Sequence, residues 1–239
     1  MSGRPSKPVL RLAHRGDHRR HPENSPAALV AAARLPGIDG VEFDVRFSGD
    51  GEPVLLHDET LARVQGVGER AAALRAAELI RLGVSPLAEA LAAMPVSAFL
   101  DAELKEVPNE RFAAVLRAAR GERPLRAAIS SFDGAALEVA RALLPDWPRW
   151  LNALMIDPKA LEVALRLGCR GLSVDHRTLD RTTVALAHAA ALVVVAWTLT
   201  NRADERRAMD LAVDCAIVEG AITTQARAPV RAAPEPGGG

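Results

Sequence analysis

The stretch Leu12-Ala13-His14-Arg15-Gly16 is a short apolar run that ends in a histidine, an arginine and a glycine. Three later stretches have the same plan, with polar side chains near the end of an apolar run: Val41-Glu42-Phe43-Asp44-Val45, Leu56-His57-Asp58 and Ala102-Glu103-Leu104-Lys105. Their histidines, carboxylates, arginine and lysine are the groups that a divalent metal, a bound phosphate and an acid/base pair require. If the runs are barrel strands, all of these groups converge on one rim.

Short apolar, β-branched runs alternate along the chain with helical patterns rich in alanine and leucine. Such alternation is typical of parallel βαβ units. The runs that qualify as strands number eight, as a closed barrel requires, and cover residues 9–14, 40–47, 97–105, 126–131, 149–154, 171–175, 193–198 and 215–218. We therefore predict the α/β fold class, with a (β/α)8 TIM barrel.

The helical patterns between these runs carry start and stop signals. Ser25-Pro26 pairs an N-cap serine with proline at the first helical position, and Pro36-Gly37 ends that helix. Further helices are expected over 109–120, 134–143, 158–167, 182–190 and 203–212. Gly121 and Gly168 stand where glycines commonly end a helix.

One apolar run, residues 53–57, breaks the alternation. It is separated by a few residues from the strand predicted over 40–47, whereas a parallel crossover needs a dozen or more. The connection is therefore expected to be a β-hairpin, an antiparallel excursion after the second strand. Pairing Ser48 with Pro53 and counting back places Asp44 opposite His57, which would bring that histidine beside the acidic strand.

We expect a single domain. The chain has 239 residues, close to the length of one barrel, and 49% of them are hydrophobic, enough for one sizeable core. Residues 1–8 are expected to be a flexible lead-in, 9–227 the barrel domain and 228–239 a disordered tail that ends in Gly237-Gly238-Gly239.

Composition narrows the partners and the location. The net charge is +0 and aromatics make up 3%, so neither an electrostatic nor a stacking surface for nucleic acid is expected. A secretory signal and a bilayer-spanning apolar stretch are not predicted, so stable membrane association is not expected. Cys169 and Cys215 sit in apolar contexts typical of buried free thiols, which favours a reducing cytoplasm. The oligomeric state is left open.

Glu42 and Asp44 are separated by one residue, so on a strand they share a face, while the apolar residues around them face the helices. Two carboxylates on one buried face are costly unless something compensates their charge. A hard cation does so, and Mg²⁺ or Ca²⁺ prefers oxygen ligands. Salt bridges to Arg15 or Arg46 are the alternative explanation of this pair.

Glu103 and Lys105 repeat the same spacing on another predicted strand. Glu103 can complete a three-carboxylate set, and Lys105 can offset negative charge or hold a phosphate oxygen. A simple ion pair between the two is the alternative. His14 and His57, each next to acids, favour general acid/base chemistry, and Arg15 can grip a phosphate at two points. Of the other histidines, His18, His21 and His188 are expected on the surface, while His176 follows a strand and lies on the same rim.

The ordered set of motifs resembles the glycerophosphodiester phosphodiesterase family. It consists of His14-Arg15-Gly16, Pro22-Glu23-Asn24-Ser25, Glu42-x-Asp44, Asp50-Gly51-x-Pro53-Val54, His57-Asp58 and Glu103-x-Lys105, with Ser130-Ser131-Phe132-Asp133 and Ala196-Trp197-Thr198 as later landmarks. Each motif is weak alone, but the order is specific. The resemblance extends from about Leu12 to Asp214.

This resemblance implies a metal-dependent TIM barrel that cleaves small glycerophosphodiesters to glycerol 3-phosphate and an alcohol. By position, the resemblance implies that His14 and His57 are the acid/base histidines and that Glu42, Asp44 and Glu103 bind Mg²⁺ or Ca²⁺. It also implies that Arg15 and Lys105 contact the phosphate and that Trp197 lines the substrate end of the pocket. The alternatives are a phospholipase D-like or phosphoinositide phospholipase-like enzyme on the same barrel, acting on lipid, and a non-catalytic metal-dependent ligand-binding relative. The missing signal, membrane helix and basic patch count against the first, and the two histidines count against the second.

The final strand departs from the family pattern. Val218-Glu219 stands where members usually show Thr-Asp, and the helix that would follow is expected to be missing or frayed. We expect this departure to affect the last barrel unit and the choice of diester.

Overall fold

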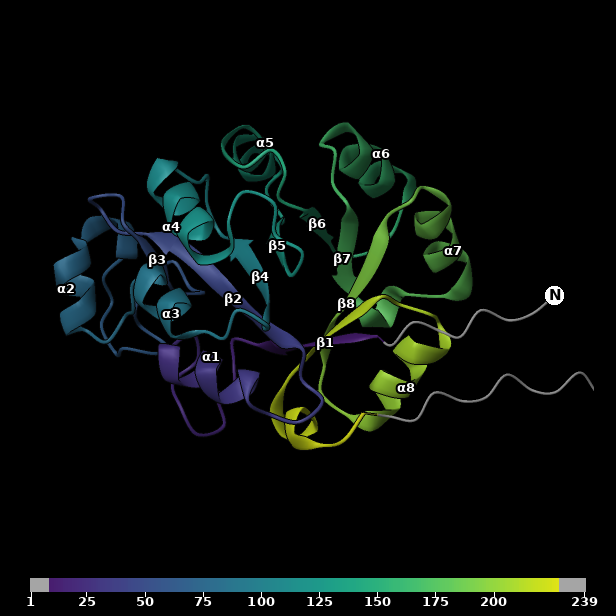
Figure 1. Ribbon diagram of the computed structural model, residues 1–239, viewed down its shortest axis with the longest axis horizontal. Helices are drawn as coiled ribbons and strands as arrows, with labels where there is room; N and C mark the ends of the chain where they lie inside the picture. The colour runs from purple at the N-terminus through teal and green to yellow at the C-terminus, as the bar shows by residue number, and fades with distance from the viewer. Residues whose placement is uncertain (1–8, 228–239) are drawn as a thin grey trace, which may run out of the picture.

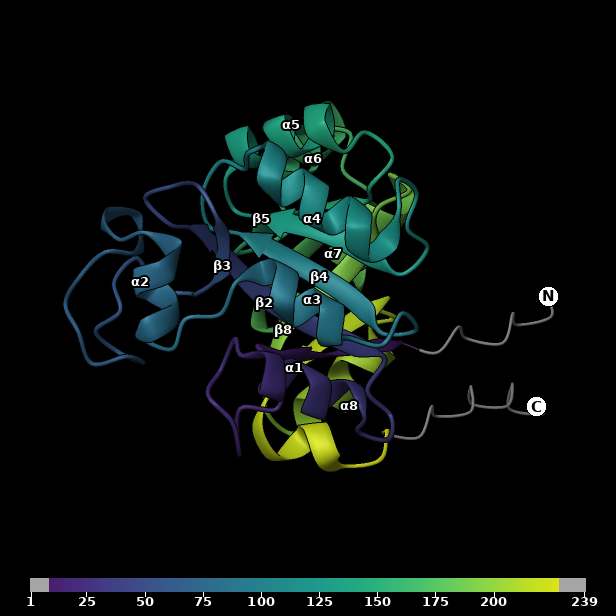
Figure 2. The ribbon, with the colours of Figure 1, turned by 60° about the vertical axis from the view of Figure 1, so that its left-hand side comes forward.

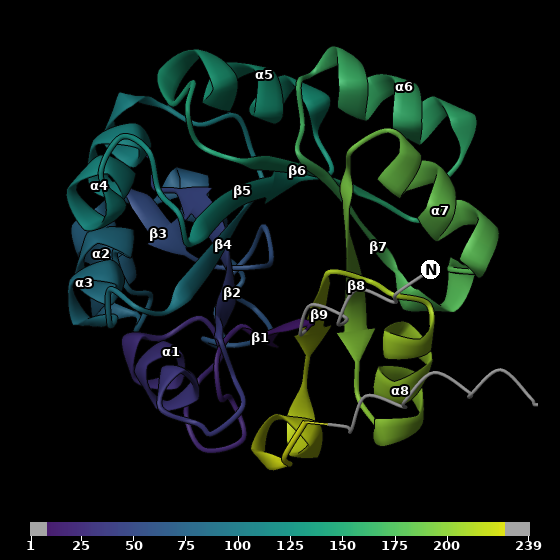
Figure 3. The same ribbon diagram turned by 45° about the vertical axis from the view of Figure 1, so that its right-hand side comes forward.

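The computed structural model describes residues 9–227. The expectations of a flexible lead-in over 1–8 and a disordered tail over 228–239 concern residues outside that range. The described chain forms a barrel of eight parallel strands with helices around it, as Figure 3 shows. The predicted TIM-barrel fold is confirmed.

The barrel strands follow the eight predicted runs closely. They are β1 (Leu10–His14), β2 (Gly40–Phe47), β4 (Phe99–Leu104), β5 (Ala127–Ser131), β6 (Arg149–Ala153), β7 (Gly171–Asp175), β8 (Val193–Leu199) and β9 (Cys215–Val218). Each strand is parallel to its neighbours in the barrel, and β1 pairs with both β2 and β9. That double pairing closes the sheet, so the carboxyl ends of all eight strands meet on one rim.

The outer ring consists of α1 (Pro26–Ala33), α3 (Leu87–Ala93), α4 (Glu110–Arg120), α5 (Gly134–Leu143), α6 (Pro158–Arg166), α7 (Arg181–Ala189) and α8 (Arg202–Asp210). Side-chain caps start most of them where the sequence predicts; the Ser25 hydroxyl, for example, accepts a hydrogen bond from the Ala28 amide of α1. Such a cap stabilises a helix by about 1 kcal/mol. The sequence did not predict α3, because its seven residues are too short for a strong helical period.

The alternation of side chains along the strands builds two apolar layers. Val41, Phe43 and Val45 of β2 face outward into the core beneath the helices. Leu12, Phe99 and Trp150 belong to a separate cluster inside the barrel, where the rings of Phe99 and Trp150 stack with centroids 5.6 Å apart. The intervening polar residues of β2 therefore face the barrel interior, as the two-residue period predicts.

The excursion after β2 is confirmed as an antiparallel strand, β3 (Pro53–Leu55), outside the barrel. The predicted register was wrong by one residue, because Phe47 rather than Ser48 lies opposite Pro53. Asp44 accordingly accepts a backbone hydrogen bond from Leu56 instead of facing His57 directly. The connection between β2 and β3 runs from Ser48 to Glu52, so it is one residue longer than the predicted pairing of Ser48 with Pro53 implies. The Ser48 amide donates a hydrogen bond to the Glu52 carbonyl within this turn.

The excursion continues through a 3₁₀ turn, η1 (Ala71–Ala73), and α2 (Ala76–Arg81), which project to one side of the barrel in Figures 1 and 2. It has its own small apolar cluster, which includes Val54, Leu56 and Leu61. This independent core fixes the segment that carries His57 beside the barrel rim.

The described chain after β9 forms the 3₁₀ helix η3 (Gly220–Thr224), with no α-helix before Arg227. The buried guanidinium of Arg11 holds this segment: its Nη2 donates to the Ile222 carbonyl over 2.8 Å, and its Nε lies 2.9 Å from Glu205 of α8. The last barrel unit is therefore short but anchored to the first strand.

Candidate active site

The carboxyl ends of the strands surround a cavity of about 280 Å³, which we call the rim cavity. Its lining contains His14, Arg15, Glu42, His57, Asp101, Glu103, Lys105 and Trp197. Another cavity, of about 480 Å³, lies at the opposite end of the barrel, among strand starts such as Leu10 and Cys215, and its lining is mainly apolar. The groups able to do chemistry gather in the smaller cavity.

Three carboxylates form what we call the acid cluster: Glu42 and Asp44 of β2, and Glu103 of β4. Asp44 and Glu103 are paired in the β2–β4 register, and Glu42 lies two residues before Asp44 on the same face. One oxygen of each lies within 4.8 Å of the others. Glu42 and Asp44 are 2% and 1% exposed. The structure thus brings together the three side chains that the sequence predicts as metal ligands; their role as ligands stays a prediction.

Burial and mutual repulsion disfavour the ionised form of two of the three carboxylates in the acid cluster. Burial, together with repulsion from Asp44 and Glu103, raises the pKa of Glu42 well above its usual value. Burial also raises the pKa of Glu103. For Asp44 burial acts in the same direction, but Lys105 and Arg15 outweigh it and hold the pKa of Asp44 below its usual range. A positive charge placed among these oxygens would stabilise all three carboxylates in their ionised form.

The donor set fits a hard divalent cation. Oε1 of Glu42 is buried and has no hydrogen-bond partner within residues 9–227. Buried polar atoms are seldom left without a partner, so this oxygen is a candidate ligand atom. Three carboxylates and no thiolate favour Mg²⁺ or Ca²⁺ over softer metals. Glu42, Asp44 and Glu103 are thus the residues that can hold such an ion.

Two cations flank Asp44. Arg15 Nε lies 3.0 Å from Asp44 Oδ2, and Lys105 Nζ lies 2.9 Å from Asp44 Oδ1 and also contacts Glu103. The ion pairs considered from the sequence as an alternative to a metal are therefore present for Arg15 and Lys105. Arg46 instead pairs with Glu106, at 3.1 Å. Lys105 remains positively charged because Asp44 and Glu103 outweigh burial and raise its pKa.

The loop after β1 is shaped to aim Arg15 at the cavity. Arg15 has a positive φ of 53°, and Gly16 follows at 81°. A Cβ on Gly16 would come within 2.5 Å of the Ala28 backbone, so a larger residue does not fit there. Asn24 completes the loop: its side chain donates to Asp44 Oδ2 over 2.7 Å and accepts from the Asp44 amide over 3.1 Å. The Pro22-Glu23-Asn24-Ser25 motif thus fixes the position of Asp44.

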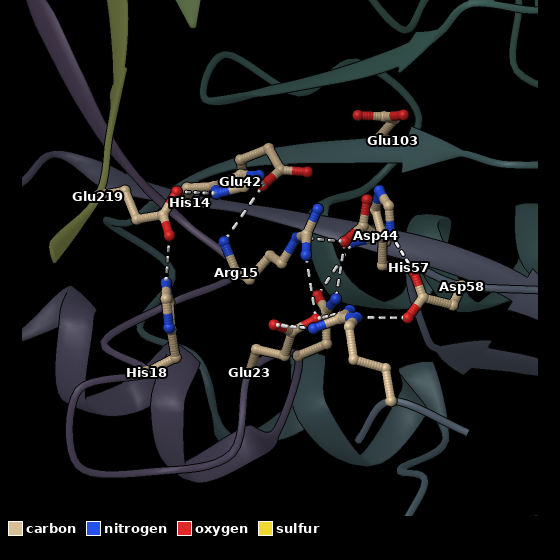
Figure 4. A network of polar contacts seen from close by, with 12 residues as sticks. His14, Arg15, His18, Glu23, Glu42, Asp44, His57, Asp58, Glu103 and Glu219 are labelled. Carbon is tan, nitrogen blue, oxygen red and sulfur yellow. Dashed lines mark hydrogen bonds and ion pairs between the residues drawn. The ribbon is translucent and has the colours of Figure 1, made fainter. Parts of the chain in front are cut away.

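His14 and His57 each face a carboxylate through Nδ1. His14 Nδ1 lies 2.9 Å from Glu219 Oε2, and His57 Nδ1 lies 2.7 Å from Asp58 Oδ1. The Nε2 atom of His14 lies 3.9 Å from Glu42 Oε2, so that side of the ring faces the acid cluster, as Figure 4 shows. The two histidines come from different segments, β1 and the excursion, yet both line the rim cavity.

Trp197 of β8 lines the rim cavity beside Phe132, whose ring meets it edge-on with centroids 5.8 Å apart. Phe132 is 52% exposed. The two rings form an aromatic part of the cavity wall. Aromatic walls of this kind can pack against the carbon skeleton of a small polar ligand.

Three residues in or next to the rim cavity were not predicted from the sequence as site residues. Asp101 lines the cavity at full burial, and burial raises its pKa to about 8. It sits two residues before Glu103, so the same-face spacing could have identified it. His18, expected on the surface, is half-buried and lies 3.4 Å from Glu219. Glu219 was noted as a departure from the family pattern, but its contact with His14 depends on strands at the two ends of the chain.

Other histidines lie apart from the acid cluster. His176 lines a neighbouring cavity with Asp175 and Asp204, and its Nε2 lies 3.9 Å from Asp204. His188 pairs with Asp214 at the surface, as expected for a helix-surface residue. Within residues 9–227 no helix is long and apolar enough to cross a membrane.

The model of the glycerophosphoryl diester phosphodiesterase family matches residues 14–116 and 94–221. A glycerophosphodiester phosphodiesterase from Caldanaerobacter subterraneus is 50% identical over 55 residues, which are 23% of this chain and 22% of that protein. The matched segment thus spans about a fifth of the length of the curated relative.

Solved structures match over most of their length. A phosphodiesterase from Oleispira antarctica in complex with the product sn-glycerol-3-phosphate is 28% identical, with a TM-score of 0.76, over 87% of this chain and 92% of that one. A glycerophosphodiester phosphodiesterase from Thermotoga maritima is 25% identical, with a TM-score of 0.72, over 89% and 95%.

Proposed function

This chain belongs to the glycerophosphoryl diester phosphodiesterase family, and we propose that it hydrolyses glycerophosphodiesters to glycerol 3-phosphate and an alcohol. The observation that carries the proposal is the meeting of two carboxylate-paired histidines with the acid cluster, Arg15 and Lys105 in one cavity. The glycerol 3-phosphate bound to the Oleispira antarctica phosphodiesterase supports the same product for this chain.

We propose that Glu42, Asp44 and Glu103 hold a Mg²⁺ or Ca²⁺ ion. When bound, the ion would neutralise charge on the phosphodiester and on its transition state. The unpartnered Glu42 oxygen and the raised pKa values of Glu42 and Glu103 support this assignment. Asn24 holds Asp44 in place through two hydrogen bonds, which leaves its orientation independent of the substrate.

His14 and His57 are the proposed acid/base pair. One removes the proton from the attacking oxygen, and the other protonates the leaving alkoxide. The carboxylate at Nδ1 of each ring leaves Nε2 as the atom for proton transfer. The proposal holds for either division of the two roles, and for water or the neighbouring glycerol hydroxyl as the attacking oxygen.

Arg15 and Lys105 are proposed to contact the phosphate, and Trp197 to line the substrate end. Arg15 and Lys105 are already pinned beside Asp44, so they are placed before substrate arrives. A planar guanidinium contacts two phosphate oxygens at once, whereas an ammonium acts as a point charge. The aromatic wall of Trp197 and Phe132 is proposed to meet the glycerol or the alcohol moiety.

We propose a small, water-soluble diester such as glycerophosphocholine or glycerophosphoethanolamine as substrate. The net charge of +0 gives no electrostatic attraction to an anionic lipid surface. The two free, buried cysteines support a reducing compartment, in keeping with a cytoplasmic location.

The proposal is tested by assaying the chain on glycerophosphocholine with and without EDTA, beside an aryl phosphodiester and a lysophospholipid. The expected result is metal-dependent release of glycerol 3-phosphate, fastest from the deacylated diester. Faster turnover of the lysophospholipid would favour a lipid-acting barrel. Binding of the diester without turnover, in the presence of added Mg²⁺ or Ca²⁺, would favour a non-catalytic relative.

A further inference from the structure

We propose that Glu219 is a positioning residue whose carboxylate fixes the tautomer and the ring orientation of His14. This inference rests on the proposed function for its catalytic consequence, but the hydrogen bond itself does not. It also gives a role to the residue that departs from the family pattern at the end of β9.

The two ring nitrogens of His14 have different surroundings. Nδ1 lies 2.9 Å from Glu219 Oε2, while Nε2 lies 3.9 Å from Glu42 Oε2 on the cavity side. A neutral imidazole carries one N–H, and a carboxylate beside Nδ1 places the hydrogen there. The other ring nitrogen, Nε2, then faces the rim cavity, where the proposed proton transfer takes place.

The carboxylate is a strong acceptor in this setting. The hydrogen bond with His14 and the nearby ring of His18 outweigh burial and hold the pKa of Glu219 far below its usual range, so the group stays ionised. Its second oxygen, Oε1, lies 3.4 Å from His18 Nε2. Figure 4 shows Glu219 between the two rings, one from β1 and one from the loop that follows it.

The backbone around Glu219 is held on both sides. Its amide donates to the Leu199 carbonyl at the end of β8 over 2.9 Å. The η3 turn that follows is anchored through the Arg11 hydrogen bond to Ile222. Glu219 is therefore fixed by the sheet and by β1 itself, which carries both Arg11 and His14. An acid held in this way can orient a histidine, whereas an acid on a free loop cannot.

The second histidine has an equivalent arrangement. His57 Nδ1 meets Asp58 Oδ1 at 2.7 Å, and Asp58 Oδ2 accepts from Arg63 Nε at 2.5 Å. Both rings thus have a carboxylate at Nδ1 that is itself held by a second basic group. Asp58 is the sequence neighbour of its histidine, but Glu219 lies 205 residues from His14.

The decisive measurement is the ¹⁵N and ¹H spectrum of the histidine rings in the full chain, with Mg²⁺ present, at about pH 8, where free imidazoles are neutral. The His14 signal is assigned by its loss in His14→Gln. We expect the Nδ1–H tautomer with a downfield ring proton in the wild type. That proton should be lost in Glu219→Ala and retained, less downfield, in Glu219→Gln, whose amide oxygen still accepts. Glu162→Ala, an exposed acid on α6, is the matched control.

Measurements of kcat and KM test the catalytic consequence of the His14–Glu219 contact. We expect kcat of Glu219→Ala to fall about 10- to 100-fold, the usual effect of removing such a partner, with KM and the metal-induced rise in Tm unchanged. Glu219→Gln should retain intermediate kcat. A wild-type His14 ring in the Nε2–H form, or a Glu219→Ala spectrum and kcat equal to those of Glu162→Ala, would overturn the inference. A wild-type chain that shows the Nδ1–H signal but cleaves no diester would instead refute the proposed function.

Discussion

Asp44 and Glu103 are direct partners in the register of β2 and β4, and Lys105 contacts both carboxylates. One lysine and one arginine thus oppose a cluster of three acids, two buried and one partly buried, of which Glu42 has an oxygen without a hydrogen bond among the described residues. The protein has assembled excess negative charge where a cation can enter.

Divalent metal should stabilise the chain before any substrate is present. After treatment with EDTA and buffer exchange, adding Mg²⁺ or Ca²⁺ should raise Tm, because a ligand that binds the folded state alone shifts the unfolding equilibrium. Glu103→Gln should abolish this rise, while the exposed control Glu162→Gln should retain it. Equal rises in the two variants would place the ion elsewhere.

Replacing either proposed acid/base residue should remove turnover without unfolding the barrel. His14→Ala and His57→Ala should each lower kcat by about 10²-fold or more, with Tm close to that of the wild type, since both side chains lie at the rim rather than in the core. His188→Ala, at a surface position on α7, is the control. The pH profile of kcat/KM should show two limbs, which report the pair as a whole. Full activity in either variant would exclude that histidine from proton transfer.

Arg15→Lys should be harmful although the charge is kept. The guanidinium reaches Asp44 through Nε at 3.0 Å and Glu23 through Nη1 at 3.1 Å, and a single ammonium cannot span both while contacting phosphate. We expect kcat/KM to fall on the order of 10-fold or more. Arg20→Lys, at an exposed position in the same loop, should have no effect. Wild-type kcat/KM in Arg15→Lys would rule out a two-point phosphate contact.

The Glu219–His18 pair should stabilise the fold within a defined pH window. The lowered pKa of Glu219 means that its contribution is present above the ordinary carboxyl pKa and is lost as pH falls through the folded value. Glu219, acting against burial, raises the pKa of His18 with help from Glu23, while Arg15 opposes it. The His18 contribution is therefore complete below the ordinary imidazole pKa and is lost as pH rises through the folded value.

The Glu219–His18 pair should therefore stabilise the folded state most at about pH 5 to 6, between the ordinary pKa values of a carboxyl and an imidazole. Denaturant unfolding of the wild type and of His18→Ala, measured across the pH range, should show the largest difference in unfolding free energy there. Introducing Glu219→Gln into both proteins should remove most of that difference. A difference that grows steadily toward alkaline pH would contradict the prediction.

The two thiols should be inert in the native state. Burial raises the pKa of Cys169 to about 11 and the pKa of Cys215 well above its usual value. Thiolate, the reactive form, is therefore scarce, and both side chains are buried. A thiol-specific colour reagent should label neither cysteine in native protein and both in denaturant. Leu125→Cys, at a position that is 97% exposed, should add one rapidly labelled thiol. Rapid labelling of the native wild type would show that the barrel opens readily.

The sequence predicted most of the fold because the signals are local. Two-residue alternation along β2 predicts that Glu42 and Asp44 point one way and their apolar neighbours the other. The predicted ends of α4 and α6, marked by Gly121 and Gly168, lie within a residue of those in the structure. The short helices α2 and α3 were not predicted, because six or seven residues give too little periodic signal.

The register of the hairpin was misjudged by one residue, and this error also has a physical cause. Turn length sets the register, and the turn after Phe47 is fixed by bonds from Ser48 to Glu52 and from Gly49 to Leu74. The second of these bonds comes from a distant part of the excursion. Counting residues between two apolar runs cannot detect a contact of that kind.

The sequence by itself therefore determined which side chains the parallel strands bring to the rim, and so the membership of the acid cluster and the presence of His14 there. The hairpin predicted after the second strand accounts for His57 beside them. The tertiary structure alone decided which carboxylate meets which ring. His14 and Glu219 are 205 residues apart, and they meet because β1 closes the barrel against β9. Closure brings the two ends of the chain together through pairings spread over every intervening strand. No local pattern of residues encodes the distance between them.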